Sequence, residues 1–350
     1  MNTKRNTTRQ TTRRKPQHQE SYFDPIKRRL IKFWLPALIL IGAMIYVSQW
    51  RYTPEREAKY GLDRVNFWRA QAGVGKLEFN SLLALSAKNH AQYLTRKAEG
   101  HDENDSGAAG FTGKTAQNRA TYVGYPAQIA ENLTISNWAR SSKSSVDGLM
   151  TALYHRLSLL NPQHDEAGAS WARGRYNAFV INQGSSKYRE LCDNRSNAIA
   201  ANYILTTYCL EQKVNIAINT PPAERLEPVM FPIGNNIDPI YDGREFPNPM
   251  PDRKQTGNPV SIAFYGEQSP VRMISFTLTA PDGEITNTRI LTAQNDPNHL
   301  LGENEFALFS LDKLKFNTTY QVSFKYQQNQ QTHTKNWTFK TRAKRHLLEW

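Results

Sequence analysis

The chain has 350 residues, of which 39% are hydrophobic and 21% charged, a balance typical of globular domains that excludes a collagenous or wholly disordered chain. Its net charge of +13 is unevenly distributed: residues 1–32 hold ten Lys or Arg against Glu20 and Asp24, a net of +8, so the other 318 residues share +5. A basic face for nucleic acid is therefore not indicated, and we expect no nucleic-acid partner.

Residues 33–50, which follow the basic segment, form the uncharged stretch FWLPALILIGAMIYVSQW. As a helix it would be about 27 Å long at ~1.5 Å per residue, enough to cross the hydrocarbon core of a bilayer. Trp34, Tyr46 and Trp50 lie near its ends, where aromatic side chains favour the headgroup region. We expect a transmembrane signal anchor over 33–50. A cleaved signal peptide is the alternative, although its apolar region is usually ~7–15 residues long and followed by small residues.

The basic residues before this stretch predict the orientation of the chain. Lys27, Arg28, Arg29 and Lys32 immediately precede it, and such residues remain on the cytoplasmic side of a membrane. We therefore expect residues 1–32 to be a basic cytoplasmic tail of a single-pass membrane protein, with the rest of the chain exported. The tail could also bind anionic lipid headgroups.

Apolar residues at helical spacing predict helices in the next part of the chain. Residues 54–98 read as two helices separated at 73–75, and residues 99–120, rich in Gly, Asp, Asn, Ser and Thr, read as a loop. Residues 144–160 read as one further helix that ends at Asn161-Pro162.

Short β-rich runs accompany these helices at 176–182 and near 204–209. Helices mixed with short strands predict an α+β domain over residues 55–218. By contrast, residues 219–258 are rich in Pro, Asn and Asp and predict an extended connector without a core of its own.

The C-terminal part of the chain has a different pattern. Short runs of alternating apolar residues separated by turn signals, such as Pro281-Asp282-Gly283, predict an all-β sandwich over 259–341. Residues 342–350 read as a basic tail.

Two cysteines, Cys192 and Cys209, lie 17 residues apart on the exported side of the apolar stretch. In an oxidising compartment they would form a disulfide that stabilises the fold by ~2–4 kcal/mol. Two unpaired buried thiols are the alternative. There is no Cys-x2-Cys spacing, so a thiolate zinc site is not indicated.

Six short segments occur in an order that is typical of one protein family. They are LDRVNFWR at 62–69, LEFNSLLA at 77–84, Gly100-His101, Arg119 with Gly124-Tyr125, AENL at 130–133 and YHRLSLLNP at 154–162. Together they resemble the bacterial, SCP-like branch of the CAP superfamily, which includes cysteine-rich secretory proteins, antigen 5 and plant pathogenesis-related proteins. The segment 314–341 is similar, more loosely, to Ig- or fibronectin-like modules of bacterial envelope proteins.

The resemblance implies the fold class and the location of the protein. The fold would be α+β, with a CAP-like α-β-α sandwich around a central antiparallel sheet, one transmembrane helix before it and a C-terminal Ig- or fibronectin-like β-sandwich after it. The protein would lie in the bacterial inner membrane with its N-terminus in the cytoplasm and its C-terminal domains in the periplasm or otherwise outside the cytoplasm.

The resemblance also implies a shallow cleft that presents two His and two Glu. His101 corresponds to the first His, Glu131 to the first Glu and His155 to the second His. The second Glu has no counterpart in the helix at 144–157, where Asp147 is the only acidic residue nearby. Three residues would support the cleft: Asn132, Arg119 and Arg156, the two arginines as structural partners of carboxylates.

Two imidazoles and one carboxylate could bind Zn²⁺ through His101, Glu131 and His155 and leave a position for water. The alternative is a hydrogen-bonded polar cluster that orders the loops of the cleft. No cofactor is required by the sequence, and no catalytic residue is assigned. Of the other histidines, His90 is expected at the core or rim of a helix, and 164–166 is expected to be an exposed turn.

Two functions follow from these observations. The first is a binding or scaffolding module of the cell envelope that uses the His/Glu cleft and takes an envelope protein, a lipid or a glycan as its ligand. The second is a metal-dependent hydrolase acting on peptide, lipid or cell-wall material. The missing second Glu favours binding over enzymatic activity, and no Gly-x-Ser-x-Gly, P-loop or His-Glu-x-x-His motif occurs in a supporting context.

Overall fold

The computed structural model describes residues 24–51, 53–137, 141–193, 203–206, 209, 215–218, 227–266 and 269–346. The chain divides into two compact units, Met1–Thr53 and Pro54–Trp350. Of the predicted segments, 1–23 of the basic tail, 219–226 of the connector and 347–350 of the C-terminal tail lie outside the described residues.

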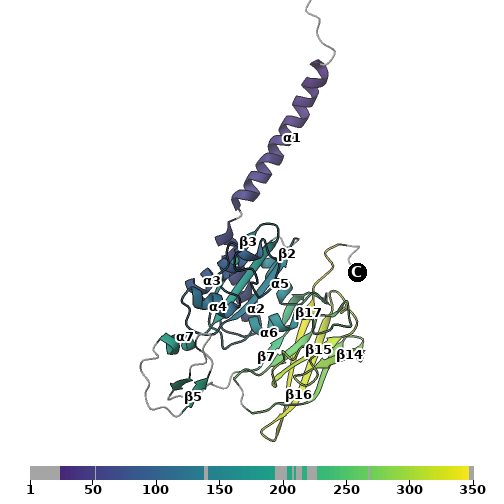
Figure 1. The fold of residues 1–350 in the computed structure, drawn as a ribbon. Helices are drawn as coiled ribbons and strands as arrows, with labels where there is room; N and C mark the ends of the chain where they lie inside the picture. The colour runs from purple at the N-terminus through teal and green to yellow at the C-terminus, as the bar shows by residue number, and fades with distance from the viewer. Residues whose placement is uncertain are drawn as a thin grey trace, which may run out of the picture. The chain divides into compact units, whose positions relative to one another are not determined.

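The described part of the first unit is the helix α1 (Asp24–Arg51) (Figure 1). Its segment Leu30–Val47 has 18 residues, a mean hydropathy of 2.1 and no buried residue. The helix is therefore long and apolar enough to cross a membrane, a test that a cleavable signal sequence also passes.

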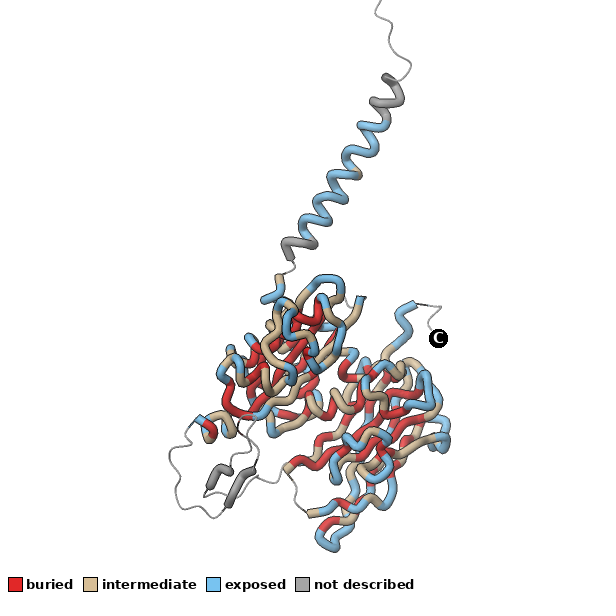
Figure 2. Tube along the Cα trace, viewed as in Figure 1, coloured by how far each residue is buried: buried red, intermediate tan, exposed pale blue. Residues whose placement is uncertain are grey.

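The second unit begins with a four-stranded sheet in the order β1-β3-β4-β2. These strands are β1 (Glu78–Phe79), β3 (Glu166–Arg173), β4 (Asn177–Gly184) and β2 (Ala130–Ser136). The neighbours are antiparallel except β1, which runs parallel to β3. The central strand β4 is buried along almost its whole length (Figure 2), as expected when both faces of a sheet are covered.

Helices pack on both faces of this sheet. On one face lies α3 (Ser81–Leu94), so close that a Cβ on Gly168 would lie 1.9 Å from the main-chain nitrogen of Ala84. On the other face lies α2 (Pro54–Gln71), where Gly61 meets the ring of Phe179. The sheet and its helices therefore form three layers, and the two predicted helices of 54–98 are present.

Several local features differ from the sequence expectation. The predicted loop 99–120 contains the start of α4 (Ala116–Tyr122), because Thr115 and Asn118 form a reciprocal capping box. The predicted exposed turn at 164–166 leads into β3, and Glu166 is buried, accepting hydrogen bonds from Tyr125 and Arg189.

The single helix predicted over 144–160 is two helices, α5 (Ser142–Leu149) and α6 (Leu153–Leu159). The chain is interrupted between them because a carboxylate from a distant segment, Glu245, binds the main-chain N–H groups of the first turn of α6. Such groups have no partner inside the helix, so a carboxylate there stabilises a helix start at that point.

The C-terminal part of the second unit contains two facing sheets. One has the order β14-β15-β11-β7, and the other has the order β13-β12-β16-β17-β8. Phe306 of β15 and Phe324 of β16 lie with ring centroids 5.1 Å apart, so the two sheets share a core. The strands of the first sheet are β14 (Thr288–Leu291), β15 (Glu305–Ser310), β11 (Val260–Ala263) and β7 (Val229–Phe231). Those of the second are β13 (Gly283–Glu284), β12 (Arg272–Ala280), β16 (Thr319–Gln328), β17 (Gln331–Thr341) and β8 (Gly234–Ile237).

The segment 219–258 differs from the extended connector that its prolines predicted. Its described part supplies β7 and β8 at the edges of the two sheets and the short pair β9 (Ile240–Tyr241) and β10 (Thr256–Gly257). The prolines lie between these strands, where the absence of a ladder N–H is tolerated. The described residues 227–258 therefore belong structurally to the C-terminal β domain.

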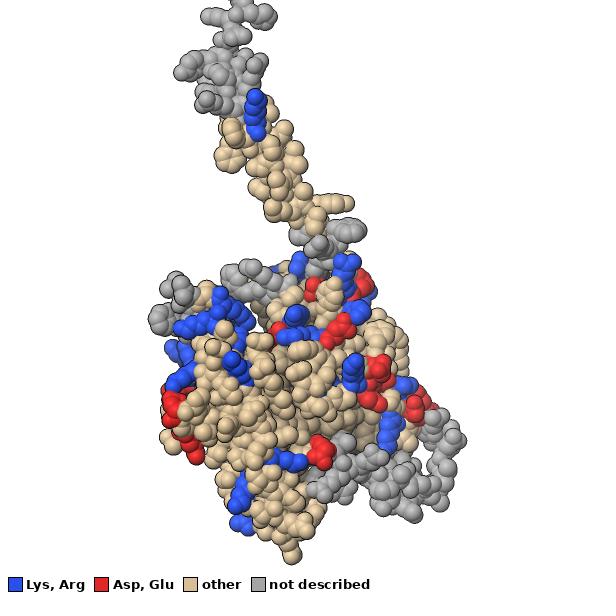
Figure 3. Space-filling view, turned by 180° about the vertical axis from the view of Figure 1, so that it is seen from behind, with Lys and Arg blue, Asp and Glu red and all other residues tan. Residues whose placement is uncertain are grey.

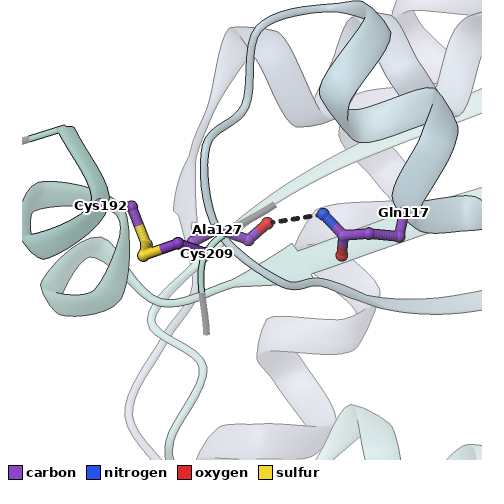
Figure 4. Close-up of a disulfide and its surroundings, with 4 residues drawn as sticks. All are labelled: Gln117, Ala127, Cys192 and Cys209. Atoms are coloured by element: carbon purple, nitrogen blue, oxygen red, sulfur yellow. Dashed lines mark hydrogen bonds between the residues drawn. A yellow bond between two sulfur atoms is a disulfide. The ribbon is translucent and has the colours of Figure 1, made fainter. Parts of the chain in front are cut away.

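The two cysteines form the predicted disulfide (Figure 4). Cys192 lies in α7 (Ser186–Asp193), and Cys209 bridges the main chain of Ala127, whose carbonyl accepts a hydrogen bond from Gln117. Both cysteines are buried against Leu83 of α3. Near them, β5 (Tyr203–Thr206) and β6 (Asn215–Ile218) form a separate antiparallel pair.

Candidate functional site

His101 and Glu131, predicted to share a cleft, are in contact. His101 lies in the loop after α3, and Glu131 lies in the edge strand β2; His101 Nδ1 is 3.1 Å from Glu131 Oε1. The His101 side chain is 44% exposed, whereas that of Glu131 is only 2% exposed. The carboxylate of Glu131 is therefore buried beneath the imidazole of His101, and the imidazole is partly exposed at the protein surface.

Arg119 of α4 donates hydrogen bonds to the buried carboxylate of Glu131. Its Nη2 donates to both carboxylate oxygens of Glu131, at 2.8 and 3.0 Å, and to the main-chain carbonyl of His101 at 2.8 Å. Burial alone would raise the pKa of Glu131, but the hydrogen bond from His101 and the charges of His90, Arg119 and His101 lower it to about 2. Glu131 is consequently ionised at neutral pH, and Arg119 is the carboxylate partner that the sequence predicted.

A second pair lies beneath the first. His90 of α3 is fully buried, with Nδ1 2.8 Å from Glu103 Oε1 and Nε2 3.0 Å from the carbonyl of Gly100. Its Nε2 also lies 3.7 Å from Glu131. His90 is thus the satisfied buried histidine expected from its helix face. Glu103, which lies in a polar loop, was not predicted because nothing local distinguishes it from its exposed acidic neighbours.

His155 of α6 lies beside His101, with ring centroids 6.2 Å apart and planes inclined by 21°. Its Nδ1 is 3.0 Å from Oε1 of Glu245, whose side chain is fully buried. The carboxylate paired with His155 therefore comes from the segment between β9 and β10. Asp147, the acidic residue noted in the sequence, lies in α5 and binds Arg64 and Trp68 instead.

Glu245 also fixes the helix that carries His155. Its oxygens accept the main-chain N–H groups of Leu153 at 2.7 Å, Tyr154 at 2.7 Å and His155 at 3.1 Å. Ala152, at the N-cap position of α6, has no side chain that could do this. The C-terminal β domain therefore determines where α6 begins and how His155 is oriented.

Other contacts of α6 reach the same domain. Tyr154 donates a hydrogen bond to Asp296, and Tyr265 donates one to the carbonyl of Leu157 at 2.7 Å. Burial, followed by the hydrogen bond to Asp296, raises the pKa of Tyr154. Together with Glu245, these groups come from three separate segments of the β domain, so α6 is held on several sides.

Arg156 and Asn132, predicted as supporting residues, have structural roles. Arg156 is fully buried, donates to Asn258 at 3.1 Å and lies 4.8 Å above the ring of Phe231, so burial lowers its pKa to about 9. It thus binds an amide and an aromatic ring of the β domain, and the negative charge of Glu245 opposes the lowering of its pKa. Asn132 is buried and donates to Ser158 and Gln183, which connects β2 to α6 and β4.

The three residues considered for Zn²⁺ are not arranged as metal ligands. Each imidazole uses Nδ1 for its own carboxylate, and both oxygens of Glu131 accept from the Arg119 guanidinium. Among the described residues, no group of three or more His, Cys, Asp or Glu is placed to hold a metal ion. The donor set therefore does not fit the zinc site that the sequence allowed.

A comparison with protein families identifies part of this three-layer unit. Residues 62–183 match the model of the family described as "CAP: Cysteine-rich secretory protein family". These residues form a CAP domain. The match covers the sheet, α3, α4, α5 and α6, and therefore includes His101, Glu131 and His155, whereas Glu245 lies outside the CAP domain.

Three solved structures are similar to part of the chain. An outer surface protein from Borrelia burgdorferi is 19% identical over 37% of this chain and 92% of its own, with a TM-score of 0.32. An extracellular protein containing an SCP domain from Bacillus anthracis is 20% identical over 38% of this chain and 41% of its own, with a TM-score of 0.32. A cysteine-rich secretory protein from Staphylococcus aureus is 19% identical over 38% and 40%, with a TM-score of 0.29.

This chain thus spans about two fifths of the length of the Bacillus and Staphylococcus proteins. No curated protein matches the chain.

Proposed function

We propose that the protein is a membrane-anchored binding module of the bacterial cell envelope, in which His101 and His155 of the CAP domain present their Nε2 atoms to a ligand. The observation that carries this proposal is that each ring is held at Nδ1 by its own buried carboxylate, Glu131 or Glu245. Rings held in this way lose little side-chain freedom on binding. Their Nε2 atoms can donate or accept a hydrogen bond, depending on protonation.

The hydrolase alternative has less support. A metal-dependent reaction would need ligands that converge on one point, and the oxygens of Glu131 already bind Arg119 and His101. A nucleophilic reaction would need a Ser, Thr or Cys within hydrogen-bond reach of an imidazole. In the described part of the chain, the side-chain partners of the two rings are carboxylates.

The surface charge favours a ligand other than nucleic acid. On the face in Figure 3, a few Lys and Arg gather at the upper left, and elsewhere Lys and Arg lie beside Asp and Glu around a broad uncharged area. A nucleic-acid site normally concentrates Lys and Arg on one face or along one helix. An envelope protein, a glycan or a lipid headgroup remains the class of ligand that we propose.

A binding comparison tests this proposal. The fragment 54–350, which is compact by itself, would be titrated with soluble peptidoglycan fragments and with vesicles of phosphatidylethanolamine and phosphatidylglycerol. We expect one of these probes to bind the wild type and to bind His101→Ala and His155→Ala at least about tenfold more weakly, as for a central contact residue. The exposed Lys325→Ala serves as the control and should bind like the wild type.

Two results would contradict the proposal. If the wild-type fragment binds neither probe, or if binding survives both substitutions, the imidazole pair is not the binding site for these ligands. If instead a probe is hydrolysed only with added Zn²⁺ and neither variant hydrolyses it, the hydrolase alternative is favoured.

A further inference from the structure

The strand β3 has an edge that is paired only at its start. On one side all eight residues of β3 pair with β4, but on the other side β1 pairs only with Glu166 and Ala167. The chain leaves this edge at Asn80, where α3 begins. Among the described strands none pairs with the next part of this edge, from Gly168 to Ala172. An edge of this length is normally covered or blunted in natural proteins.

The free edge presents main-chain donors and acceptors. Asn80 donates its N–H to the carbonyl of Ala167 at 2.9 Å, which shows that the main-chain groups of Ala167 point away from β4. In an antiparallel ladder this direction alternates from residue to residue. The N–H and C=O groups of Ala169 and Trp171 therefore point toward the same side, away from β4, in two residues that are 6% and 1% exposed.

A groove runs along this edge between α2 and α3. Its volume is about 1480 Å³, and Ala169–Arg173 of β3 form its floor. Its walls include Leu62 and Phe67 of α2, Leu85 of α3 and Phe79 of β1. We call this the β3-edge groove. The floor is about 17 Å long at ~3.3 Å per residue, which matches an extended segment of five residues.

The walls are apolar and basic. Phe67, Phe79 and Leu85 are 45%, 67% and 45% exposed, values that are high for side chains of this size. Five basic side chains line the groove against three acidic ones, and one pair of these, Lys59 and Asp63, forms a salt bridge. The exposed Lys88 and Arg96 lie along the α3 side.

We infer that the β3-edge groove binds an extended peptide segment of another protein, with alternating apolar and acidic residues, as an additional strand in line with β1. The peptide main chain would pair with Ala169 and Trp171. Its apolar side chains would cover Phe67 and Phe79 on the α2 side, and its carboxylates, on the opposite face of the added strand, would approach Lys88 and Arg96 on the α3 side. Recognition by strand addition gains affinity from main-chain hydrogen bonds and specificity from alternate side chains.

Two other occupants fit this groove less well. An acyl chain would fill the apolar walls but would leave the main-chain groups of Ala169 and Trp171 without partners, which is costly for buried groups. The same edge of a second copy of the chain would also be recessed between its own two helices. Two recessed floors cannot approach to the ~4.8 Å that strand pairing requires.

The test uses a defined peptide and the fragment 54–350. A fluorescein-labelled octapeptide that alternates Glu and Val is compared with a Lys and Val octapeptide and with the Glu and Val peptide N-methylated at every amide. We expect the first to bind, the second to bind at least about tenfold more weakly and the third not to bind. Hydrogen exchange at the amides of Ala169 and Trp171 should slow on binding, while Ser170 and Ala172, which bond to β4, should change little.

Substitutions separate main-chain pairing from nonspecific adhesion. Ala169→Pro removes one N–H from the groove floor but none from the ladder with β4, and it should abolish peptide binding, whereas Ala169→Ser keeps the N–H and should bind normally. If Ala169→Pro does not fold, the exposed pair Lys88→Glu with Arg96→Glu replaces it. That double variant should prefer the Lys and Val peptide.

The inference is overturned by any of three results. These are that the wild type binds neither peptide, that it binds sodium oleate but not the Glu and Val peptide, or that it forms a dimer that Ala169→Pro abolishes. None of these results concerns His101 or His155, so they are independent of the proposed function of the imidazole pair.

Discussion

At the scale of single residues, the His101–Glu131 pair depends on buried ionisable groups that have partners of opposite charge. Glu131 lies between Arg119 and His101, and Glu103 lies beside His90. Removing one partner of such a pair leaves an uncompensated charge inside the protein, which typically costs ~3–5 kcal/mol. The partly exposed His101 is therefore bound to buried groups, and removing any one of these groups should destabilise the fold.

The titration of Glu131 gives a prediction about acid stability. Its folded-state pKa of about 2 lies below the ordinary value of 4.5, so its contribution is fully present above pH ~4.5 and is lost as the pH falls toward 2. The difference corresponds to about 3 kcal/mol, at ~1.4 kcal/mol per pKa unit. In Glu131→Gln the free energy of unfolding should be lower at pH 7 and should depend less on pH between 4.5 and 2.

Urea denaturation at a series of pH values measures this effect. The exposed Glu284→Gln is the matched control and should reproduce the wild-type curve. An unchanged pH dependence in Glu131→Gln would show that the carboxylate is not ionised in the way that its contacts indicate.

The sequence predicted the residues of one half of the site better than those of the other. His101, Glu131 and His155 lie in short motifs that resemble a family pattern, and the structure brings both histidines together. Glu245 could not be predicted, because it is 90 residues from His155 in sequence and lies among prolines that suggested a connector. A pair of this kind is determined by how two domains pack, and no local pattern encodes it.

At the scale of secondary structure elements, α6 depends on a cap from another domain. The seven-residue helix is too short to be stable alone, since isolated helices below ~12–15 residues are marginal in water. Its first N–H groups bind Glu245, and its side chains bind Asp296 and Asn258. This explains why periodicity alone predicted one helix over 144–160: apolar spacing continues through the break, but the cap that starts a new helix is distant in sequence.

Removal of this cap should destabilise the second unit. Glu245→Ala eliminates three hydrogen bonds to main-chain N–H groups and the partner of His155, so we expect the free energy of unfolding to fall by ~2–4 kcal/mol. Glu245→Gln keeps an acceptor oxygen and should lose less. Thermal and urea denaturation of the fragment 54–350 measure both.

Glu227→Ala is a suitable control for this comparison, because the Glu227 side chain is 91% exposed and pairs with Lys335 at the surface. If Glu245→Ala and Glu227→Ala have equal stability, α6 does not require the carboxylate. If Glu245→Gln is as unstable as Glu245→Ala, the negative charge rather than the acceptor geometry is what α6 requires.

At the scale of the whole molecule, an apolar helix precedes a folded unit in which two domains share buried contacts. The sequence pattern predicted the helix and the C-terminal sheets: the uncharged stretch indicated α1, and the alternating C-terminal runs indicated strands. The extent of the contact between the CAP domain and the β domain was not predicted. It depends on single side chains such as Arg156 and Phe231, which have no distinctive spacing.

The anchoring and orientation of the full chain can be tested directly. The basic residues before Leu30–Val47 predict a cytoplasmic N-terminus. The two native cysteines are joined in a disulfide, so single cysteines can be introduced for labelling. In intact spheroplasts a membrane-impermeant maleimide should label Lys325→Cys, on the exposed face of β16, but should label Thr7→Cys only after the membrane is permeabilised.

Alkaline carbonate extraction should leave the full-length chain in the membrane fraction, because a helix of this hydropathy stays in the bilayer when peripheral contacts are removed. If the chain is instead recovered in the soluble fraction and lacks its first ~50 residues, the apolar helix acts as a cleaved signal sequence. If Thr7→Cys is labelled before permeabilisation, the orientation is inverted. In that case the basic residues before α1 do not determine topology, and the CAP domain would face a reducing compartment in which its disulfide is not expected to persist.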